Sequence, residues 1–322
     1  MMECAESISS TESQAIKFLR ALAIVFILLC HLFEAYGSGW STLFYIGVPI
    51  FFILSGWLYG HKKLKYWRSF AFSRFLKIYI PYLTFVLPAL GLFLIFHPDK
   101  ITGLKVLVYV LNLQGFTGCE LGLNHLWFVT AIVACYCFLP LLQFFRRYRL
   151  GAVILCWTLL VLDFVMFKGR LYWLPLFAIS YYLASAGRRE IRISAWAVGI
   201  VLLSQLVLWN RPFLMGALEQ CNLMRSLGAL AIVYVTIWRV CKKGGYNNSL
   251  LNHITLMVSF FSYGLYLVHN IWCVGPFSLS HLTGFVPFNI FLILVLSFLL
   301  SFVVLGVSWY FSKKLRQIRG YI

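Results

Sequence analysis

Ten long apolar runs, joined by mostly short polar connections, constrain the fold of this chain more than any other feature. The runs cover residues 15–36, 41–60, 78–96, 125–144, 150–167, 171–187, 193–209, 219–239, 252–274 and 285–311. A helix needs about 20 apolar residues to cross the hydrocarbon core of a bilayer, which is roughly 30 Å thick. Because 62% of the residues are hydrophobic and only 11% are charged, the chain has too little polar surface for a water-soluble fold. The sequence therefore predicts an all-α, polytopic membrane helical bundle of about ten transmembrane helices.

The positive charges predict how this bundle is oriented. If the N-terminus is cytoplasmic, 21 of the 27 lysines and arginines fall on the cytoplasmic side of the membrane. Such an excess is the positive-inside pattern of membrane proteins, so we expect both termini in the cytoplasm. We divide the chain into a short cytoplasmic N-terminal segment, 1–14, a transmembrane domain, 15–311, and a basic cytoplasmic tail, 312–322. The net charge is +18, and the cations form short clusters between apolar runs. This pattern indicates a protein that contacts the lipid bilayer and not one that binds nucleic acid.

Motifs for bound metals and cofactors are absent from the sequence. The nine cysteines lie mostly inside apolar runs, without a CxxC pair or another metal-ligand spacing. There is no phosphate-binding glycine loop, no zinc or calcium motif and no nucleophile elbow. We therefore expect no metal and no permanently bound cofactor.

Three ionisable residues share one face of the first predicted helix. Arg20 precedes His31 by eleven residues, which is three helical turns plus about 20° and about 16 Å along the axis. Glu34 follows His31 by three residues, where its carboxylate could hold the imidazole in one tautomer. Ionisable side chains inside a membrane usually face a cavity or a partner. We predict that Arg20, His31 and Glu34 are catalytic and line one passage; the alternative is a packing histidine with an arginine that reaches the membrane surface.

The connection 61–77 is more basic than orientation alone requires. Arg68, Arg74 and Lys77 are three of its six cations, and Arg74 and Lys77 share a face if the third helix begins early. An arginine fork and a lysine point charge at a membrane edge suit phosphate groups. We predict that these residues bind a phosphorylated ligand; the alternative is attraction of the whole connection to anionic lipids.

Five further residues are candidates for contacts with a substrate or with an oxyanion. They are Ser55, His125, Trp127, Tyr266 and His269. Tyr266 and His269 are three residues apart and share a helical face, whereas His125 and Trp127 open the fourth run at the expected outer interface. Trp127 has the alternative of an ordinary membrane-belt residue.

The second run combines Ser55 with three glycines. Gly47, Gly56 and Gly60 are small enough to let a neighbouring helix approach closely. Close packing is therefore the structural alternative for every polar or small residue of this run, Ser55 included.

Taken in order, these motifs resemble the acyltransferase-3 family of bacterial membrane O-acyltransferases. The matching segments are 20–31, 47–57, 74–82, 125–128 and 262–269. The resemblance implies about ten helices, an acyl-CoA donor that is usually acetyl-CoA, and an acceptor hydroxyl on a cell-envelope sugar or polysaccharide. It also implies a multi-pass protein of the bacterial inner (cytoplasmic) membrane, and it marks Arg20 and His31 as essential. Lys77 departs from the family, because many members have arginine there.

These observations lead to one main hypothesis and two rivals. In the main hypothesis, acyl-CoA binds from the cytoplasm through Arg20, Arg68, Arg74 and Lys77, and His31 acts either as a general base or as a transient carrier of the acyl group. The rivals are a transporter or flippase for an envelope-glycan precursor and a scaffold subunit in which the polar residues are only structural. No inverted repeat is detectable in the sequence, which argues against the transporter.

Overall fold

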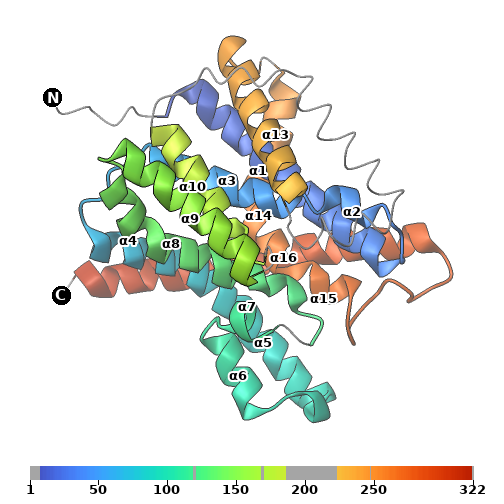
Figure 1. Ribbon diagram of the computed structural model, residues 1–322. Helices are drawn as coiled ribbons and strands as arrows, with labels where there is room; N and C mark the ends of the chain where they lie inside the picture. The colour runs from blue at the N-terminus through green and yellow to red at the C-terminus, as the bar shows by residue number, and fades with distance from the viewer. Residues whose placement is uncertain (1–7, 119–120, 168–169, 186–222, 247, 321–322) are drawn as a thin grey trace. The chain divides into compact units, whose positions relative to one another are not determined.

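The computed structural model describes residues 8–118, 121–167, 170–185, 223–246 and 248–320, and the regular elements of these residues are all helical (Figure 1). The helices are α1 (Ser10–Ala35), α2 (Ser41–Phe44), α3 (Gly47–Gly60), α4 (Trp67–Arg74), α5 (Ile80–Phe96), α6 (Gly103–Val110), α7 (Gln114–Thr117), α8 (Trp127–Phe145), α9 (Arg149–Phe167), α10 (Trp173–Ser185), α13 (Leu223–Lys242), α14 (Ser249–Val268), α15 (Asn270–Cys273) and α16 (Val286–Gly320). A π-helical turn, η1 (Phe75–Tyr79), joins α4 to α5, and two short 3-10 turns are η2 (Pro98–Lys100) and η3 (Asn124–Leu126).

Seven helical segments of the described residues are long and apolar enough to cross a membrane. They are Ser10–Ala35, Ser41–Gly60, Trp67–Phe96, Asn124–Phe145, Leu150–Phe167, Ser249–Val268 and Val286–Ile318. These segments coincide with the first five predicted runs and the last two, which confirms a polytopic membrane helical bundle.

Three predicted runs are not among these seven segments. The sixth run contains α10, an apolar helix of only 13 residues, and the eighth overlaps α13, which carries basic residues near both ends. The seventh run, 193–209, lies outside the described residues. The count of ten and the cytoplasmic termini therefore stay predictions.

The packing divides the chain into two compact units. The first unit consists of Met1–Cys30, Gly39–Lys63 and Ala134–Ser259, and the second of His31–Ser38, Leu64–Val133 and Phe260–Ile322. The boundary falls within three helices, α1, α8 and α14. Each unit is described by itself below.

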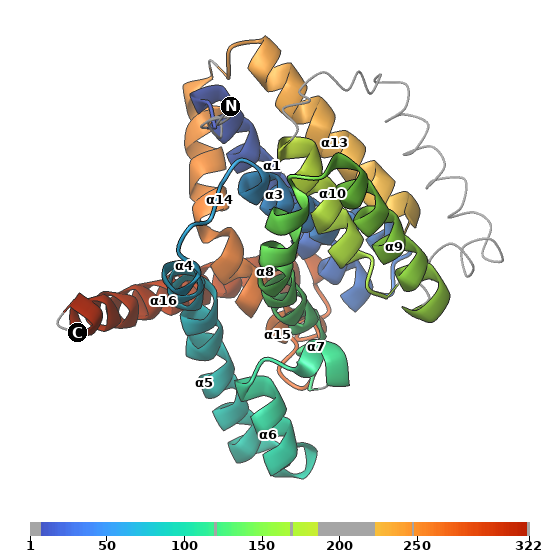
Figure 2. The same ribbon diagram turned by 60° about the vertical axis from the view of Figure 1, so that its left-hand side comes forward.

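In the first unit, glycines bring α3 against its neighbours, as their positions in the sequence predicted. A Cβ atom on Gly56 would overlap the backbone oxygen of Phe177, and one on Gly60 would overlap that of Tyr181. Both partners belong to α10, which lies beside α3 in Figures 1 and 2. At the start of α3, a Cβ atom on Gly47 would come within 2.7 Å of a backbone oxygen of α1. Close backbone approach of this kind is how membrane helices gain packing contacts.

A buried acid ties the beginning of α1 to the end of α3 in the same unit. The Glu12 side chain is 1% exposed, and its Oε1 accepts a hydrogen bond of 2.6 Å from the indole N–H of Trp57. Nε2 of His61 lies 3.2 Å from the same oxygen. The Trp57 ring also packs edge-on against Tyr234 of α13, with ring centroids 5.1 Å apart. This enclosed acid–imidazole pair therefore joins α1 to α3, and Trp57 packs both against α13.

In the second unit, α16 is polar on its buried face and aromatic on its exposed face. Its buried side chains recur at nearly four-residue spacing and include Asn289, Ile293, Ser297, Ser301, Val304, Ser308 and Ser312. Two serines reach α5 and η1: the hydroxyl of Ser308 bonds that of Thr84 at 3.2 Å, and that of Ser312 donates to the Leu76 carbonyl at 3.2 Å. This distribution is expected in a membrane, where the exposed side of a helix is more hydrophobic than its packed side. Small polar residues on the packed side hydrogen-bond to neighbouring helices.

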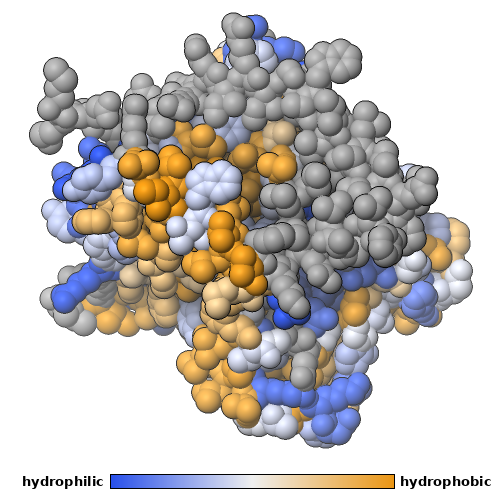
Figure 3. Space-filling model, viewed as in Figure 1, coloured by the Kyte–Doolittle hydropathy of each residue, from blue (hydrophilic) through white to orange (hydrophobic). Residues whose placement is uncertain are grey.

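The α5–α6 pair shows the same exposure of apolar side chains. Leu94 and Ile95 of α5 are 53% and 71% exposed, and Leu104 and Leu107 of α6 are 72% and 52% exposed. Figure 3 shows hydrophobic residues over α6 and hydrophilic residues gathered at the connection between the two helices. This distribution is expected for a helical pair that enters lipid and returns through a polar turn.

Candidate active site

Three histidines from distant parts of the sequence converge in the second unit. His31 comes from α1, His125 from η3, and His269 from the junction between α14 and α15. The ring centroids of His31 and His125 lie 5.1 and 5.2 Å from that of His269, and 6.5 Å from each other. His125 and His269 are 3% and 0% exposed, whereas the His31 side chain keeps 19% of its surface exposed. We call these residues the three-histidine cluster.

The hydrogen bond of His31 selects one tautomer of its neutral imidazole. Nδ1 lies 3.0 Å from Oε2 of Glu34, as the three-residue spacing predicted. Because a carboxylate only accepts hydrogen bonds, Nδ1 carries the proton. The other ring nitrogen, Nε2, then holds a lone pair in the plane of the ring. The contact between His31 and Glu34 is thus confirmed, and it produces the tautomer that a general base requires.

The two buried histidines are fixed by backbone carbonyls. Nδ1 of His269 lies 2.9 Å from the Tyr266 oxygen and 3.0 Å from the Leu265 oxygen, and Nε2 of His125 lies 2.9 Å from the Leu267 oxygen. Carbonyl oxygens only accept, so these nitrogens carry the protons. The remaining nitrogens, Nδ1 of His125 and Nε2 of His269, are buried and have no hydrogen-bond partner among the described residues.

The end of α14 explains why both imidazoles are held there. The last four carbonyls of a helix lack partners within the helix, and α14 ends at Val268. Three of those carbonyls, on Leu265, Tyr266 and Leu267, accept hydrogen bonds from imidazole N–H groups. The break between α14 and α15 therefore satisfies its own backbone by orienting the two histidines.

A buried polar network supports the segment that carries His125. The Gln114 side chain, 0% exposed, donates to Oδ1 of Asn112 and to the Leu126 carbonyl, both at 3.0 Å. Its oxygen lies 3.1 Å from the hydroxyl of Tyr82, and the Thr130 hydroxyl lies 3.0 Å from the Asn112 carbonyl. Sequence reasoning missed this network. The signal was present as polar side chains at 112 and 114, immediately after an apolar stretch.

Two predicted substrate-contact residues are connected with His125, Tyr266 by a direct contact and Trp127 by its place in the chain. The Tyr266 hydroxyl donates to the backbone carbonyl of His125, and its ring lies 5.5 Å from the His125 ring. Because this hydroxyl is hydrogen-bonded to the backbone, it holds His125 in place. We had expected the same hydroxyl to donate to an oxyanion. Trp127 is half-buried at the start of α8, with its ring edge-on to Phe128.

The predicted phosphate ligands lie on one continuous helical segment of the same unit. That segment begins at Trp67. The third helix therefore begins early, which was the condition for Arg74 and Lys77 to share a face. Arg68 and Lys77 are exposed, and the guanidinium of Arg74 lies 5.9 Å from the ring centroid of Phe70. Their role in binding phosphate stays a prediction.

Two predicted site residues belong to the first unit. Arg20 is half-buried on α1, and Ser55 is half-buried on α3. The passage that we expected Arg20 and His31 to share therefore stays a prediction, as do the roles of both first-unit residues.

One turn of α1 carries three side chains of the types that bind metal ions. The ligand atoms of Cys30, His31 and Glu34 lie within 4.8 Å of one another. A hydrogen bond already joins the His31 and Glu34 atoms, so we interpret this turn as an acid–imidazole pair.

Comparison with known proteins identifies one family. Residues 13–311 match the family model described as an acyltransferase domain, which is the acyltransferase-3 model. No curated protein and no solved structure matches the chain. The match covers nearly the whole chain, including all three histidines of the cluster.

Proposed function

This chain belongs to the acyltransferase-3 family and is a membrane acyltransferase, and from that premise we propose that it acylates a hydroxyl of a cell-envelope sugar or polysaccharide. The donor in this proposal is cytoplasmic acyl-CoA, with acetyl as the transferred group. The protein works in the bacterial inner membrane, where the cytoplasm supplies the donor and the outer side supplies the glycan.

The observation that carries the proposal is the His31–Glu34 pair beside two further imidazoles. Nδ1 of His31 is bonded to Glu34 at 3.0 Å, which leaves Nε2 with a lone pair that can take a proton. His125 and His269 each hold a buried nitrogen with a lone pair. In this proposal, the cluster opens when the acceptor binds, and these two nitrogens then accept hydrogen bonds from sugar hydroxyls and orient the acceptor next to the base.

In the direct route, Nε2 of His31 removes the proton of the acceptor hydroxyl while that oxygen attacks the thioester carbonyl carbon. The tetrahedral intermediate then expels the CoA thiolate, which takes the proton from the His31 imidazolium. The products are the sugar ester and free CoA. Glu34 stabilises the positive charge on the imidazolium during the step.

In the covalent route, Nε2 of His31 attacks the thioester carbonyl itself and CoA leaves as the thiolate. The sugar hydroxyl then takes the acyl group from the acyl-imidazole, and its proton passes to the thiolate. The routes differ in one measurable species. Rapid quenching with acetyl-CoA alone, followed by peptide mass spectrometry, finds acetyl-His31 only in the covalent route.

The donor phosphates require cations, and the basic segment before α5 supplies them. Arg74 and Lys77 suit the phosphates of CoA, the arginine through its fork and the lysine as a point charge. We expect Arg74→Ala to raise the KM for acetyl-CoA and to leave the KM for the acceptor unchanged. Equal rises in both constants would argue against a contact with the donor.

The test of the function uses the full chain in lipid nanodiscs with labelled acetyl-CoA and glycans extracted from a cell envelope. Mass spectrometry should find glycans heavier by one acetyl group, with the label attached, and His31→Ala should abolish the product. Full labelling by His31→Ala would end the catalytic assignment. Movement of a glycan across the membrane of sealed vesicles without acetyl transfer would instead favour the transporter.

A further inference from the structure

Buried hydrogen-bond acceptors without a donor gather at the junction of α14 and α15. Besides Nδ1 of His125 and Nε2 of His269, the side-chain oxygen of Asn270 is buried and has no partner among the described residues. The side chains of His269 and Asn270 are 0% and 3% exposed. Buried polar atoms are nearly always hydrogen-bonded in folded proteins, so three such atoms at one junction indicate a place where a ligand supplies the donors.

The orientation of the Asn270 amide is fixed by a neighbouring loop. Its nitrogen donates a hydrogen bond of 3.2 Å to the Gly122 carbonyl. Because a carbonyl oxygen only accepts, the amide nitrogen and not the amide oxygen must face Gly122. The amide oxygen therefore keeps its lone pairs for a different donor.

The same hydrogen bond ties together the two segments that carry the buried histidines. Asn270 directly follows His269, and Gly122 precedes His125 by three residues. The ring centroids of the two histidines lie 5.2 Å apart. The backbones also touch, because a Cβ atom on Gly122 would lie 2.9 Å from the Cα of Gly275. The three unpartnered atoms thus lie on two segments of the second unit that contact each other directly.

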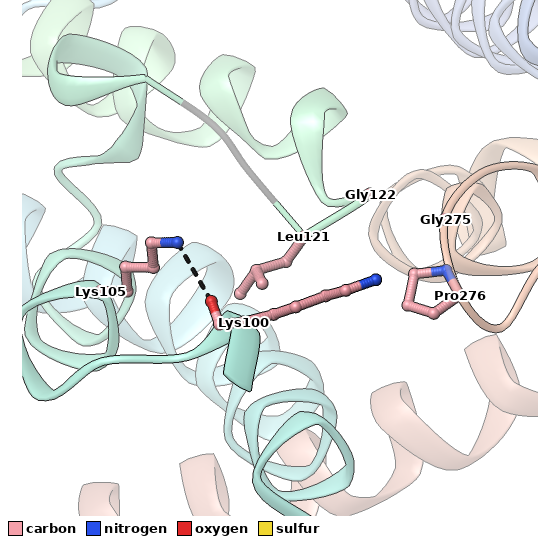
Figure 4. Close-up of a pocket in the computed structure, with 6 residues that line it drawn as sticks. All are labelled: Lys100, Lys105, Leu121, Gly122, Gly275 and Pro276. Carbon is pink, nitrogen blue, oxygen red and sulfur yellow. Dashed lines mark hydrogen bonds between the residues drawn. The ribbon is translucent and has the colours of Figure 1, made fainter. Parts of the chain in front are cut away.

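A cavity of about 330 Å³ borders the contact between these segments. Figure 4 shows Leu121 and Gly122 on one segment and Pro276 on the other, with Lys100 and Lys105 reaching the cavity from the neighbouring chain. The lining is mainly apolar. Sites for small molecules have volumes of roughly 300–1,000 Å³ and combine an apolar lining with a few polar groups that fix the orientation of the ligand. The cavity and the three buried atoms behind Gly122 match this combination.

The three buried atoms select the chemistry of a ligand, because each of them needs a hydrogen-bond donor. A hydroxyl group both donates and accepts, whereas an ionised carboxylate or phosphate group only accepts. An anionic group at this junction would leave all three atoms without a donor. The indole N–H of Trp272, on α15, is also buried without a partner among the described residues, and a hydroxyl can accept from it as well. A hydroxylated sugar ring therefore satisfies the junction better than an anionic group does.

We propose that Asn270 determines acceptor specificity, and that Asn270, His125 and His269 form a subsite for the hydroxyl groups of a neutral sugar. The inference rests on the proposed function, including the opening of the cluster when the acceptor binds. It adds a third protein atom that accepts from the sugar, the Asn270 oxygen, and it names the class of sugar. The apolar lining of the cavity would pack against the C–H face of the sugar ring.

The test measures sugar binding by the full chain in nanodiscs, without acetyl-CoA. The probes are the methyl glycosides of glucose, galactose and mannose, titrated by saturation-transfer NMR with empty nanodiscs as the blank. At least one glycoside should bind. Its monodeoxy analogue that lacks a hydroxyl of the subsite should bind roughly three- to tenfold more weakly, the effect of one lost hydrogen bond. The matching methyl uronoside, with a carboxylate in place of the hydroxymethyl group, should not bind more tightly.

Variants then assign one hydroxyl to Asn270. Asn270→Ala removes the amide oxygen, so one deoxy analogue that binds the wild-type chain weakly should bind this variant as tightly as the parent glycoside does. Asn270→Asp keeps an accepting oxygen but loses the bond to Gly122, so it should retain the penalty for the missing hydroxyl. Asn252→Ala is the matched control, because the Asn252 amide also donates to a backbone carbonyl, that of Tyr246 at 3.1 Å, and lies in the first unit. Binding of acetyl-CoA should be the same in all three variants.

The proposal would be overturned if no neutral glycoside bound, if the uronoside bound more tightly, or if the hydroxyl penalties were the same in the wild type and Asn270→Ala. A purely structural Asn270 predicts the last of these results. Each penalty compares two sugars on one protein, so a smaller folded fraction does not imitate it, and the wild-type titrations decide the class of sugar even if a variant does not fold. Failure of the proposed function is a separate result, a wild-type chain that binds these glycosides and transfers no acetyl group.

Discussion

Each compact unit contains an acid–imidazole pair, and the two pairs differ in how much of them is enclosed. In the first unit, Glu12 and His61 are 1% and 7% exposed, and the indole N–H of Trp57 bonds the carboxylate. In the second unit, Glu34 and His31 are 46% and 19% exposed. The residue types are the same, and the spacing between the polar atoms is 3.2 Å in one pair and 3.0 Å in the other.

The difference shows that accessibility and tautomer decide what such a pair can do. The enclosed pair joins α1 to α3, and its burial keeps it from a ligand outside. The half-exposed pair turns one imidazole nitrogen away from the carboxylate and stands beside two buried imidazoles. We therefore expect changes in the second-unit pair to alter catalysis, and changes in the first-unit pair to alter stability.

The largest effect should come from removing the imidazole of the second unit. His31→Ala should lower kcat for acetyl transfer by roughly 10²–10⁴-fold, the usual contribution of a general base. The measurement is initial rates with labelled acetyl-CoA, expressed per mole of folded protein. His61→Ala removes an imidazole from the enclosed pair and is the matched control. Equal losses of kcat in the two variants would erase the distinction between the pairs.

The next effect tests whether the lone pairs of the buried histidines orient the acceptor. His269→Asn keeps a side-chain N–H near the position of Nδ1, which bonds the helix carbonyls, and removes the lone pair of Nε2. Loss of one hydrogen bond to the acceptor should lower kcat/KM for the acceptor roughly tenfold. KM for acetyl-CoA should not change, and kinetics with each substrate varied separately will show this.

His125→Gln is the complementary variant. Its amide can replace the Nε2–H donor to the Leu267 carbonyl while the lone pair of Nδ1 is lost. A purely structural role for these histidines predicts that both amide variants, which keep the backbone contacts, retain full activity. That result would confine the chemistry of the second unit to His31 and Glu34.

A smaller effect is expected when only the charge of Glu34 is changed. Glu34→Gln keeps an oxygen that can accept from Nδ1 of His31, so the tautomer is preserved, but the negative charge beside the imidazolium is lost. We expect kcat to fall about fivefold, equivalent to about 1 kcal/mol. Glu34→Ala should cost more, because it also frees the ring to change tautomer. Steady-state rates of the two variants decide this, and a larger loss in Glu34→Gln than in Glu34→Ala would contradict the proposed orientation of the ring.

The parts of this picture that the sequence predicted depend on local spacing. Spans such as Val286–Ile318 were predictable because a helix in lipid must satisfy its own backbone and present apolar side chains along its whole length. The His31–Glu34 contact was predictable because residues three apart are neighbours on a helix. The packed face of α16 could have been predicted in the same way, because its serines recur at nearly four-residue spacing.

The remaining parts depend on contacts between distant segments. His125 and His269 are separated by more than a hundred residues, and their convergence follows from contacts between η3 and the end of α14, which spacing does not encode. Glu12 also depends on a contact between distant segments. It lies in the predicted cytoplasmic segment 1–14, whose location stays a prediction, but α1 begins at Ser10 and buries this carboxylate against Trp57.

The smallest effect on catalysis should come from Glu12, and here stability is the informative measurement. Glu12→Ala leaves the Trp57 indole N–H, on a side chain only 2% exposed, without its acceptor. A buried donor that loses its partner costs about 1–3 kcal/mol, so the thermal unfolding temperature in detergent should fall while kcat per folded molecule stays nearly constant. Glu34→Ala makes the same chemical change at a half-exposed carboxylate and should give the reverse, a reduced kcat with little change in unfolding temperature. If Glu12→Ala lowered kcat as much as Glu34→Ala in fully folded protein, enclosure would not separate a structural pair from a catalytic one in this fold.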